Sequence, residues 1–372
     1  MSGQFSPLQS PISAVGAALA TLVLASCLSS CTPQTHGKPP ASGTAVPFAF
    51  WNLENLFDAD DDPDNDGDDE YLPGKEWTQE RYTLKVNHLA EAIAALDVDV
   101  LGVCEVENRR TLEDLVSHAA IAARGYQIAH LDSPDLRGID LALLVAKPLR
   151  ITGDPVLHPI DLGEDERPTR GVLEVQIQIQ SRPLTVLVNH WPSRYGGREE
   201  STPRREKAAR VVRAIVNERM RTAAQNGSEA EVLIMGDFND DPWDDSVKGI
   251  LGAAKELRTV THPYNLFTQN DKQTAPRLYN PTWSLLANGD QGTYYYWTDW
   301  TWNVFDQIMV SPGLLDGQGI DYVEGSVRVH APEFLRDTEK NAHRPARFRK
   351  FRGVWEEGYS DHFAVRGELI LH

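Results

Sequence analysis

Val232-Leu233-Ile234-Met235-Gly236-Asp237-Phe238-Asn239 is the stretch of this 372-residue chain that indicates its fold most directly. The four consecutive apolar residues at 232–235 predict a short buried strand. A carboxylate and an amide, those of Asp237 and Asn239, follow at the point where that strand ends. Strands often stop in polar turns, so one such pair says little about function by itself. It becomes informative if other strands end in the same way.

The same arrangement recurs at other predicted strands. Polar residues stand next to the ends of four more of them: Asn52 after 46–51, Glu105 after 98–104, His190 after 184–188, and Asp361 and His362 before 363–370. Protein scaffolds commonly deliver functional side chains from strand ends to one rim of a sheet. The set as a whole therefore predicts one site at a sheet edge.

Helix-like and strand-like segments are mixed along the chain. Residues 78–96 have apolar residues at helical spacing, and Thr202-Pro203 predicts the start of a helix that runs to about Ala224. Strands at 171–180 and 184–188 are close enough to pair through a hairpin turn. The sequence therefore predicts an α/β (α+β) fold with a two-layered sheet and helices outside it. Residues 46–372 contain no second linker or repeat, and we expect a single domain there.

Residues 1–31 have the features of a bacterial export signal. The apolar run at 14–25 is too short to cross a bilayer of about 30 Å and fits the hydrophobic part of a signal peptide. It leads into Leu24-Ala25-Ser26-Cys27, which resembles the lipobox of bacterial lipoproteins, and the four residues that end at Cys31 repeat the pattern. We therefore expect lipidation of Cys27 or Cys31 and a tether at 32–45, rich in Pro, Gly, Ser and Thr.

This reading predicts an exported lipoprotein that a lipid anchor holds at the outer membrane, the cell surface or the periplasm. No Lys or Arg precedes the apolar run, which counts against it. An uncleaved anchor and a plain secretory signal therefore stay open as alternatives.

The charge of the chain is unevenly distributed. The formal charge is −18, from 54 acidic and 36 basic residues, and nine of the acidic residues lie at 58–70. Residues 342–354 hold five basic residues and no acidic one. Tight binding of nucleic acid requires clustered Lys and Arg, so the composition argues against a protein that holds nucleic acid on a broad basic surface. It does not exclude an enzyme that cleaves nucleic acid during a brief contact, because bound metal and a few bases supply local positive charge.

The acidic segment resembles the start of a calcium loop. Asp62, Asp64, Asp66 and Asp68 have the alternating spacing of the first EF-hand ligands, but the twelfth position, where that loop has Glu, is Pro73. A structural Ca²⁺ site and a solvated acidic loop both stay open.

The polar residues at the strand ends suit a divalent metal and a phosphate ester. Oxygen ligands such as those of Asn52, Glu105 and Asp361 suit Mg²⁺, Mn²⁺ or Ca²⁺, and the chain has no Cys/His cluster or HExxH for zinc. His190 and His362 can move protons or, as cations, neutralise negative charge in a transition state. A bound metal polarises a phosphoryl oxygen or activates water.

These motifs, in this order, resemble those of the endonuclease/exonuclease/phosphatase superfamily, to which deoxyribonuclease I belongs. The resemblance extends from about Phe50 to His362 and rests on six segments: Phe50-Trp51-Asn52-Leu53-Glu54-Asn55, Leu101-Gly102-Val103-Cys104-Glu105-Val106-Glu107-Asn108, Val188-Asn189-His190-Trp191-Pro192-Ser193-Arg194, Ile234-Met235-Gly236-Asp237-Phe238-Asn239, Phe305-Asp306-Gln307-Ile308-Met309-Val310 and Tyr359-Ser360-Asp361-His362. It implies a four-layer sandwich, in which helices flank two packed mixed β-sheets, and a metal-dependent hydrolase of phosphoric esters.

The resemblance also implies a metal site. Glu105 would be the principal ligand, with Asn52 and Asp361 close by and Glu54 as a further acid. The implied ion is Mg²⁺ or Mn²⁺, with Ca²⁺ as an alternative.

The catalytic roles follow from the same resemblance. Asp237 would position or deprotonate the attacking water, and Asn239 would orient it and touch the phosphate. Asp306 would hydrogen-bond His362 and keep it aimed at the scissile phosphate. His190 would contact the phosphate or protonate the leaving oxygen.

Three further residues are candidates from their neighbourhood alone. Asp140, in Arg137-Gly138-Ile139-Asp140, is a candidate carboxylate partner of His190, and Arg137 lies in the same short segment. Arg194 follows His190 on a loop with Gly196-Gly197 and is a candidate phosphate-binding residue.

We therefore expect an exported or surface-anchored nuclease that hydrolyses phosphodiester bonds by attack of a metal-activated water. Nucleic acid would be a transient substrate, the membrane would be reached through the N-terminal lipid, and we infer no protein partner and a monomer. One alternative is a sphingomyelinase-like or other lipid or small-molecule phosphoesterase on the same fold. Another is a non-catalytic calcium-binding surface protein.

Overall fold

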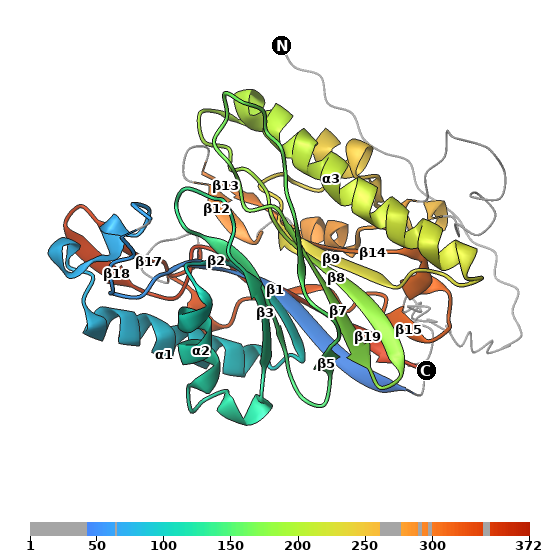
Figure 1. The fold of residues 1–372 in the computed structure, drawn as a ribbon, viewed down its shortest axis with the longest axis horizontal. Helices are drawn as coiled ribbons and strands as arrows, with labels where there is room; N and C mark the ends of the chain where they lie inside the picture. The colour runs from blue at the N-terminus through green and yellow to red at the C-terminus, as the bar shows by residue number, and fades with distance from the viewer. Residues whose placement is uncertain (1–42, 64, 261–276, 289–291, 297–299, 338–342) are drawn as a thin grey trace, which may run out of the picture. The chain divides into compact units, whose positions relative to one another are not determined.

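Two mixed β-sheets pack face to face in the computed structural model, which describes residues 43–63, 65–260, 277–288, 292–296, 300–337 and 343–372 (Figure 1). Cys27, Cys31, Asp64 and almost all of the expected tether lie outside these residues. Residues 41–372 form one compact unit. Among the described helices, none is long and apolar enough to cross a membrane.

The first sheet has the strand order β15-β19-β1-β2-β4-β3, and β16 pairs with β19. Its strands are β1 (Thr44–Leu56), β2 (Val100–Val106), β3 (Gln127–Leu131), β4 (Asp140–Val145), β15 (Ile320–Tyr322), β16 (Arg328–His330) and β19 (Ala364–Leu371). Strands β1 and β2 are parallel, and β19 runs antiparallel to β1. Residues from three distant parts of the chain therefore become neighbours in this sheet.

The second sheet has the order β10-β11-β14-β9-β8-β7-β5, and β6 pairs with β7. Its strands are β5 (Arg150–Ile151), β6 (Val156–His158), β7 (Val172–Ile179), β8 (Arg182–His190), β9 (Val232–Asp237), β10 (Ala253–Ala254), β11 (Leu278–Tyr279) and β14 (Asp306–Val310). Two separate hairpins pair β12 (Tyr294–Tyr296) with β13 (Thr301–Asn303) and β17 (Phe348–Phe351) with β18 (Val354–Glu357).

Helices cover the outer faces of both sheets, which confirms the expected four-layer α/β sandwich. Helices α1 (Gln79–Leu96) and α2 (Arg109–Ser117) pack on the first sheet, and α3 (Arg198–Gln225) packs on the second (Figure 1). The two-residue period of β1 shows the layering, since Phe48 and Phe50 enter the core between the sheets while Ala49 and Trp51 face the helices.

Helix α3 begins four residues before the expected Thr202, so Pro203 lies inside it. The prediction was wrong because the missing N–H of Pro203 leaves one carbonyl near the start of the helix, that of Glu199, without its donor, and the helix continues through it; the hydroxyls beside it also bond to the backbone. Ser201 Oγ donates to the Gly197 carbonyl (2.6 Å), and Thr202 Oγ1 donates to the Arg198 carbonyl (2.8 Å). A proline this close to the start removes only one intrahelical hydrogen bond.

Strand β1 also begins earlier than expected. Thr44 and Ala45, which the sequence analysis assigned to the tether, pair with Leu371 and Ile370 of β19. These two small residues carry no strand signal of their own, so only the pairing with β19 defines the start of β1.

Candidate active site

Strand ends from both sheets meet at one edge and bring the predicted polar residues together. Asn52 lies in β1 and Glu105 in β2, which are parallel neighbours. His190 ends β8 beside Asp237, the last residue of β9, and Asp306 begins β14 opposite Asp237. The pattern of polar residues at strand ends therefore did predict one location, although the residues are up to 310 positions apart.

Asn52, Glu105 and Asp237 form the centre of the candidate site. The Asn52 amide nitrogen lies 3.3 Å from Glu105 Oε1 and 3.2 Å from Asp237 Oδ2. The Nε2 atom of His190 lies 3.8 Å from Glu105 Oε1 and 3.7 Å from Asp237 Oδ2. Asn239 donates its backbone N–H to Asp237 Oδ1 (2.9 Å) and its amide to the Trp191 carbonyl (3.0 Å). Asn239 thus fixes the second oxygen of Asp237.

His362 forms the hydrogen bond with Asp306 that the resemblance implied. The distance from Nδ1 to Asp306 Oδ2 is 2.7 Å, and Nε2 lies 3.7 Å from Asp237 Oδ2. Burial opposes the charge on His362, but the carboxylates of Asp306 and Asp237 outweigh it and raise its pKa to about 10. His362 is therefore an imidazolium at neutral pH, aimed at the centre of the site.

The second histidine has the opposite electrostatics. Burial lowers the pKa of His190 well below its ordinary value, and the charges of Arg170 and Arg137 add to the effect. Its Nδ1 is buried and has no hydrogen-bond partner among the described residues. His190 is therefore a neutral imidazole, which can accept or pass a proton where His362 cannot.

The prediction that Asp140 is the carboxylate partner of His190 was wrong. Asp140 Oδ2 bonds His130 Nε2 (2.9 Å), and its Oδ1 accepts the Ser133 N–H (2.8 Å). Asp140 begins β4, which has β3 on its far side, so its carboxylate meets the β3 side chain His130. Arg137 is 55% exposed and lies 3.7 Å from Asp135 Oδ1, so it acts on His190 only through its charge.

Two basic residues that the sequence analysis did not assign to the site lie against its carboxylates. Arg347 Nε bonds Glu54 Oε1 (2.7 Å), and Arg347 Nη2 bonds Asp361 Oδ2 (2.7 Å). Lys85 is fully buried and donates to the Tyr359 carbonyl (2.7 Å). Burial lowers the pKa of Lys85 to about 8, although the negative charges of Glu54 and Asp361 act in the opposite direction. A signal for Lys85 was present, because it stands four residues before the buried Leu89 on the apolar face of α1.

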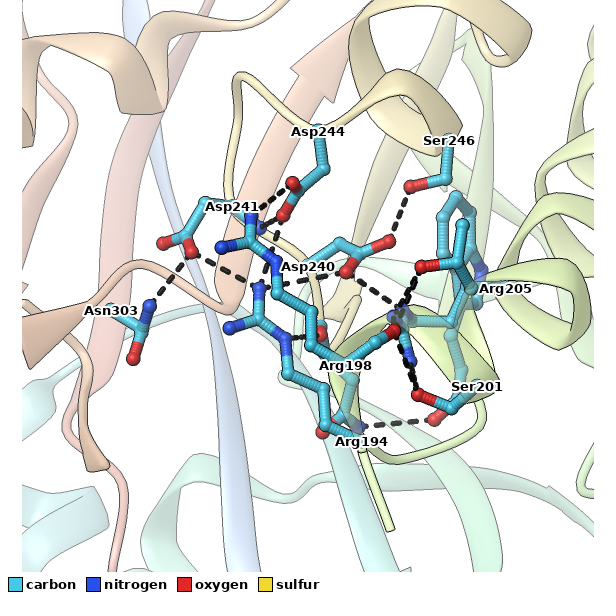
Figure 2. Close-up of polar contacts among 12 residues, drawn as sticks. Arg194, Arg198, Ser201, Arg205, Asp240, Asp241, Asp244, Ser246 and Asn303 are labelled. Atoms are coloured by element: carbon cyan, nitrogen blue, oxygen red, sulfur yellow. Dashed lines mark hydrogen bonds and ion pairs between the residues drawn. The ribbon is translucent and has the colours of Figure 1, made fainter. Parts of the chain in front are cut away.

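Arg194 does not face the site, which corrects the prediction that it binds phosphate. Its Nε donates to the Asn239 carbonyl (2.9 Å), and its Nη2 lies 3.1 Å from both Asp241 Oδ2 and Asp244 Oδ2. Figure 2 shows the surrounding set, called here the Arg194 network. It consists of Arg194, Arg198 and Arg205 with Asp240, Asp241 and Asp244. Because its Nε donates to a backbone carbonyl and its Nη2 to two aspartates, Arg194 is a structural residue of the loop after β9.

The acidic segment does not reproduce the order of ligands in an EF-hand. Asp61, Asp68 and Asp69 are the residues whose carboxylate oxygens lie within 4.8 Å of one another, and Asp68 Oδ2 accepts the N–H of Asp62 (2.7 Å). Asp62, Asp66 and Asp68 do not form such a group among the described residues, and Asp64 lies outside them. Calcium binding by this segment stays a prediction.

The donor set of the candidate site fits a divalent cation. We call Glu54, Glu105, Asp237, Asp306 and Asp361 the carboxylate cluster. With all five acids ionised, Lys85, Arg347 and protonated His362 offset three of the five negative charges. Burial raises the pKa of Glu54 and of Asp237 to about 7, as expected where negative charge is in excess. An ion with two positive charges would neutralise the remainder, and amide and carboxylate oxygens are the ligands that Mg²⁺ and Mn²⁺ prefer.

The comparisons with known proteins agree with the fold. The family described as Endonuclease/Exonuclease/phosphatase family matches residues 47–370. A D. rerio TDP2 humanised by 14 mutations is 12% identical over 87% of this chain and 98% of its own, with a TM-score of 0.52. An endonuclease/exonuclease/phosphatase family protein from Bacteroides thetaiotaomicron is 16% identical over 89% of this chain and 100% of its own, with a TM-score of 0.50. None of the curated proteins matches the sequence.

Proposed function

The chain belongs to the endonuclease/exonuclease/phosphatase family, whose members hydrolyse phosphoester bonds, and on this premise we propose that it is a divalent-metal-dependent nuclease. The observation that carries the proposal is the placement of one imidazolium, one neutral imidazole and one shared carboxylate around a single point. His362 and His190 each have Nε2 3.7 Å from Asp237 Oδ2. This arrangement suits attack on a phosphate ester, in which negative charge develops and two protons change place.

The residues of the chain take separate roles in this reaction. Asp237, with a pKa raised to about 7 by burial, accepts the proton of the attacking water. The charge on His362 stabilises the additional negative charge on the phosphoryl oxygens, and Asp306 keeps the ring in place through Nδ1. Neutral His190, whose Nε2 lies 3.7 Å from Asp237 Oδ2, takes up the proton that Asp237 has received and passes it to the leaving oxygen. A Mg²⁺ or Mn²⁺ ion held by Glu105 would polarise the phosphoryl oxygen and lower the pKa of water, and Asn52 donates its amide N–H to Glu105 Oε1 and keeps that carboxylate in place.

Aromatic side chains beside the site support nucleic acid as the substrate. The Tyr294 ring of β12 lies 4.7 Å from the His362 ring, centroid to centroid. Tyr195 follows the His190 strand on a loop and is 88% exposed. Aromatic rings next to a phosphate-cleaving centre can stack on bases without sequence preference. The net charge of −18 then favours a brief encounter over tight binding.

A substrate panel tests this proposal. The full-length protein is incubated with single-stranded DNA, double-stranded DNA, RNA and sphingomyelin vesicles, each with Mg²⁺, Mn²⁺, Ca²⁺ or Zn²⁺, and Glu105→Ala serves as the control. We expect cleavage of nucleic acid with Mg²⁺ or Mn²⁺ and none with Glu105→Ala. Intact nucleic acid together with release of phosphocholine would instead identify a lipid phosphoesterase.

We also propose that the protein is an exported lipoprotein, on the basis of the sequence pattern that ends at Cys27 or Cys31. Metabolic labelling with a radioactive fatty acid tests this in a bacterial host. We expect the label in the wild type and its loss in either Cys27→Ala or Cys31→Ala, which identifies the modified residue. Absence of label from the wild type would contradict the proposal.

A further inference from the structure

Arg347 is held between two acids that the resemblance assigned to the metal site. Its Nε and Nη2 atoms each lie 2.7 Å from a carboxylate oxygen, of Glu54 and Asp361 respectively. The Arg347 side chain is 20% exposed and that of Glu54 is 4% exposed, so water screens the pair weakly. One planar guanidinium therefore bridges the two carboxylates.

Both side-chain oxygens of Glu54 already accept a hydrogen bond, and Oδ2 of Asp361 is paired with Arg347. Glu54 Oε1 accepts from Arg347 Nε and Glu54 Oε2 accepts the Phe348 N–H, both at 2.7 Å. Its own N–H donates to Asn52 Oδ1 (2.9 Å), with Glu54 at a φ of 50°. Hydrogen bonds thus hold both the backbone and the side chain of Glu54 in place, with the carboxylate facing Arg347.

The backbone around Arg347 is fixed as well. The Arg347 carbonyl accepts the Gly358 N–H (2.8 Å), and the Ala346 carbonyl accepts the N–H groups of Tyr359 (2.6 Å) and Ser360 (3.1 Å). These hydrogen bonds join the segment before β17 to the segment that leads to Asp361. The hairpin of β17 and β18 begins at the next residue, Phe348. The position of the guanidinium therefore follows from the fold and not from a freely moving side chain.

Charge divides the site into two halves. In the first half, Arg347 and buried Lys85 offset Glu54 and Asp361, and the four charges cancel. In the second half, Glu105, Asp237 and Asp306 have no ion pair with an arginine or a lysine among the described residues, and their partners are the histidines His190 and His362. The place where a divalent ion lowers the energy most is therefore beside Glu105 and Asp237.

We propose that Arg347 is the permanent counter-cation of Glu54 and Asp361, so that these two carboxylates do not bind the divalent ion. The ion is held on the side of Asn52 and Glu105, and the guanidinium occupies the position of a second cation. The inference rests on the metal dependence in the proposed function and departs from the ligand set that the resemblance implied, in which Asp361 is a ligand.

Counting bound Mn²⁺ tests the inference. Metal-free full-length protein is titrated with Mn²⁺, and free Mn²⁺ is followed by electron paramagnetic resonance. We expect one ion per wild-type chain. Arg347→Met should bind a second ion through the released carboxylates, and the double variant Arg347→Met/Glu54→Gln should return to one. The matched control is Arg349→Met, which removes a cation two residues further along the chain, in β17, that pairs with Glu356; it should still bind one ion.

A second ion in the wild type that Glu54→Gln removes, or no added ion in a folded Arg347→Met variant, would overturn the inference. Isosteric variants keep it falsifiable if Arg347→Met does not fold. Glu54→Gln should weaken Mn²⁺ binding by less than about tenfold, and Glu105→Gln by at least about 100-fold. Equal losses in these two variants would also overturn it. Failure of the proposed function has a different signature, because the wild type would then bind no Mn²⁺ or Glu105→Gln would bind it as well as the wild type does.

Discussion

The end of β9 and the loop after it carry acids of two charge clusters, one with excess negative charge and one with balanced charge. Asp237 is part of the carboxylate cluster, whereas Asp240, Asp241 and Asp244 belong to the Arg194 network (Figure 2). The network has three arginines for three aspartates, and its charges cancel. The carboxylate cluster has five acids for three cations. Both are largely buried, so burial of charge by itself does not identify a functional site, whereas an unbalanced charge does.

The two clusters are also mechanically connected. Arg194 Nε donates to the carbonyl of Asn239, a residue at a φ of 50°. Asp241 accepts the Val304 N–H (2.9 Å) and the Asn303 amide (2.7 Å), just before Asp306. The balanced network therefore fixes the segments that carry Asp237, Asn239 and Asp306. The balanced Arg194 network therefore holds in place the backbone that carries the unbalanced carboxylate cluster.

Removing His362, one of the three cations of the carboxylate cluster, should have the largest effect on activity. His362→Ala should lower kcat on DNA by about 100- to 10,000-fold, because the site loses the imidazolium beside the phosphate. The far-ultraviolet circular dichroism should not change. The control is His158→Ala, which removes a different histidine–carboxylate pair, with Glu174, and should keep activity. If His362→Ala is as active as His158→Ala, the assignment of the site is wrong.

Breaking the balanced network should reduce stability. Arg194→Met leaves buried Asp241 without its cation and should lower the free energy of unfolding by about 3–5 kcal/mol, measured by urea denaturation. The matched control is Arg198→Met, because Arg198 pairs with Asp244 of the same network but its side chain is 50% exposed. It should cost less than about 1 kcal/mol. Equal losses would show that the buried position of Arg194 has no special role.

A divalent ion should stabilise the folded protein by binding at the carboxylate cluster and not at the Arg194 network. At a Mn²⁺ concentration 100 times its Kd, the wild type should gain about 2.7 kcal/mol in the free energy of unfolding, and EDTA should remove the gain. Arg198→Met should keep this gain, whereas Glu105→Ala should lose it. A gain in Glu105→Ala would place the ion elsewhere, for example at the acidic segment.

The smallest expected effect concerns a carboxylate outside both clusters. Burial raises the pKa of Glu231 from 4.5 to about 8. The folded protein then binds this proton more tightly than the unfolded chain, so ionisation costs stability as the pH rises from about 4.5 to 8. Glu231→Gln should be more stable than the wild type at pH 9 by on the order of 1 kcal/mol, and equally stable at pH 4. Thermal unfolding at the two pH values measures the difference, and a constant difference would contradict the assignment.

Much of the architecture could be predicted from local sequence. The two-residue period of the strands and the apolar stripe of α1 predicted the layers, and polar residues at strand ends predicted the edge where the site lies. The start of α3 could not be predicted in the same way. Thr202-Pro203 is a typical helix start, and only the structure shows that the helix begins four residues earlier and continues through Pro203.

The partners of charged residues were the least predictable part of the site. Arg194 lies four positions after His190 and yet bonds the aspartates of the network, and Asp140, the expected partner of His190, bonds His130. Arg347 lies 293 positions from Glu54 and still bonds it. Neighbourhood along the chain is a poor guide here, because an ion pair between side chains depends on which strands adjoin and which way each side chain faces.

The sequence by itself determined the family, the layered fold and the residue types at the edge of the sheets, because hydrophobic period and strand-end chemistry are local properties. Only the tertiary structure decided which charges cancel. Whether an acid is a potential metal ligand or half of an ion pair depends on distances of a few ångströms between segments far apart in the chain. Coulombic energy in a buried site changes steeply over that range, and the folding of β17 and β18 against the first sheet sets those distances for Glu54, Asp361 and Arg347.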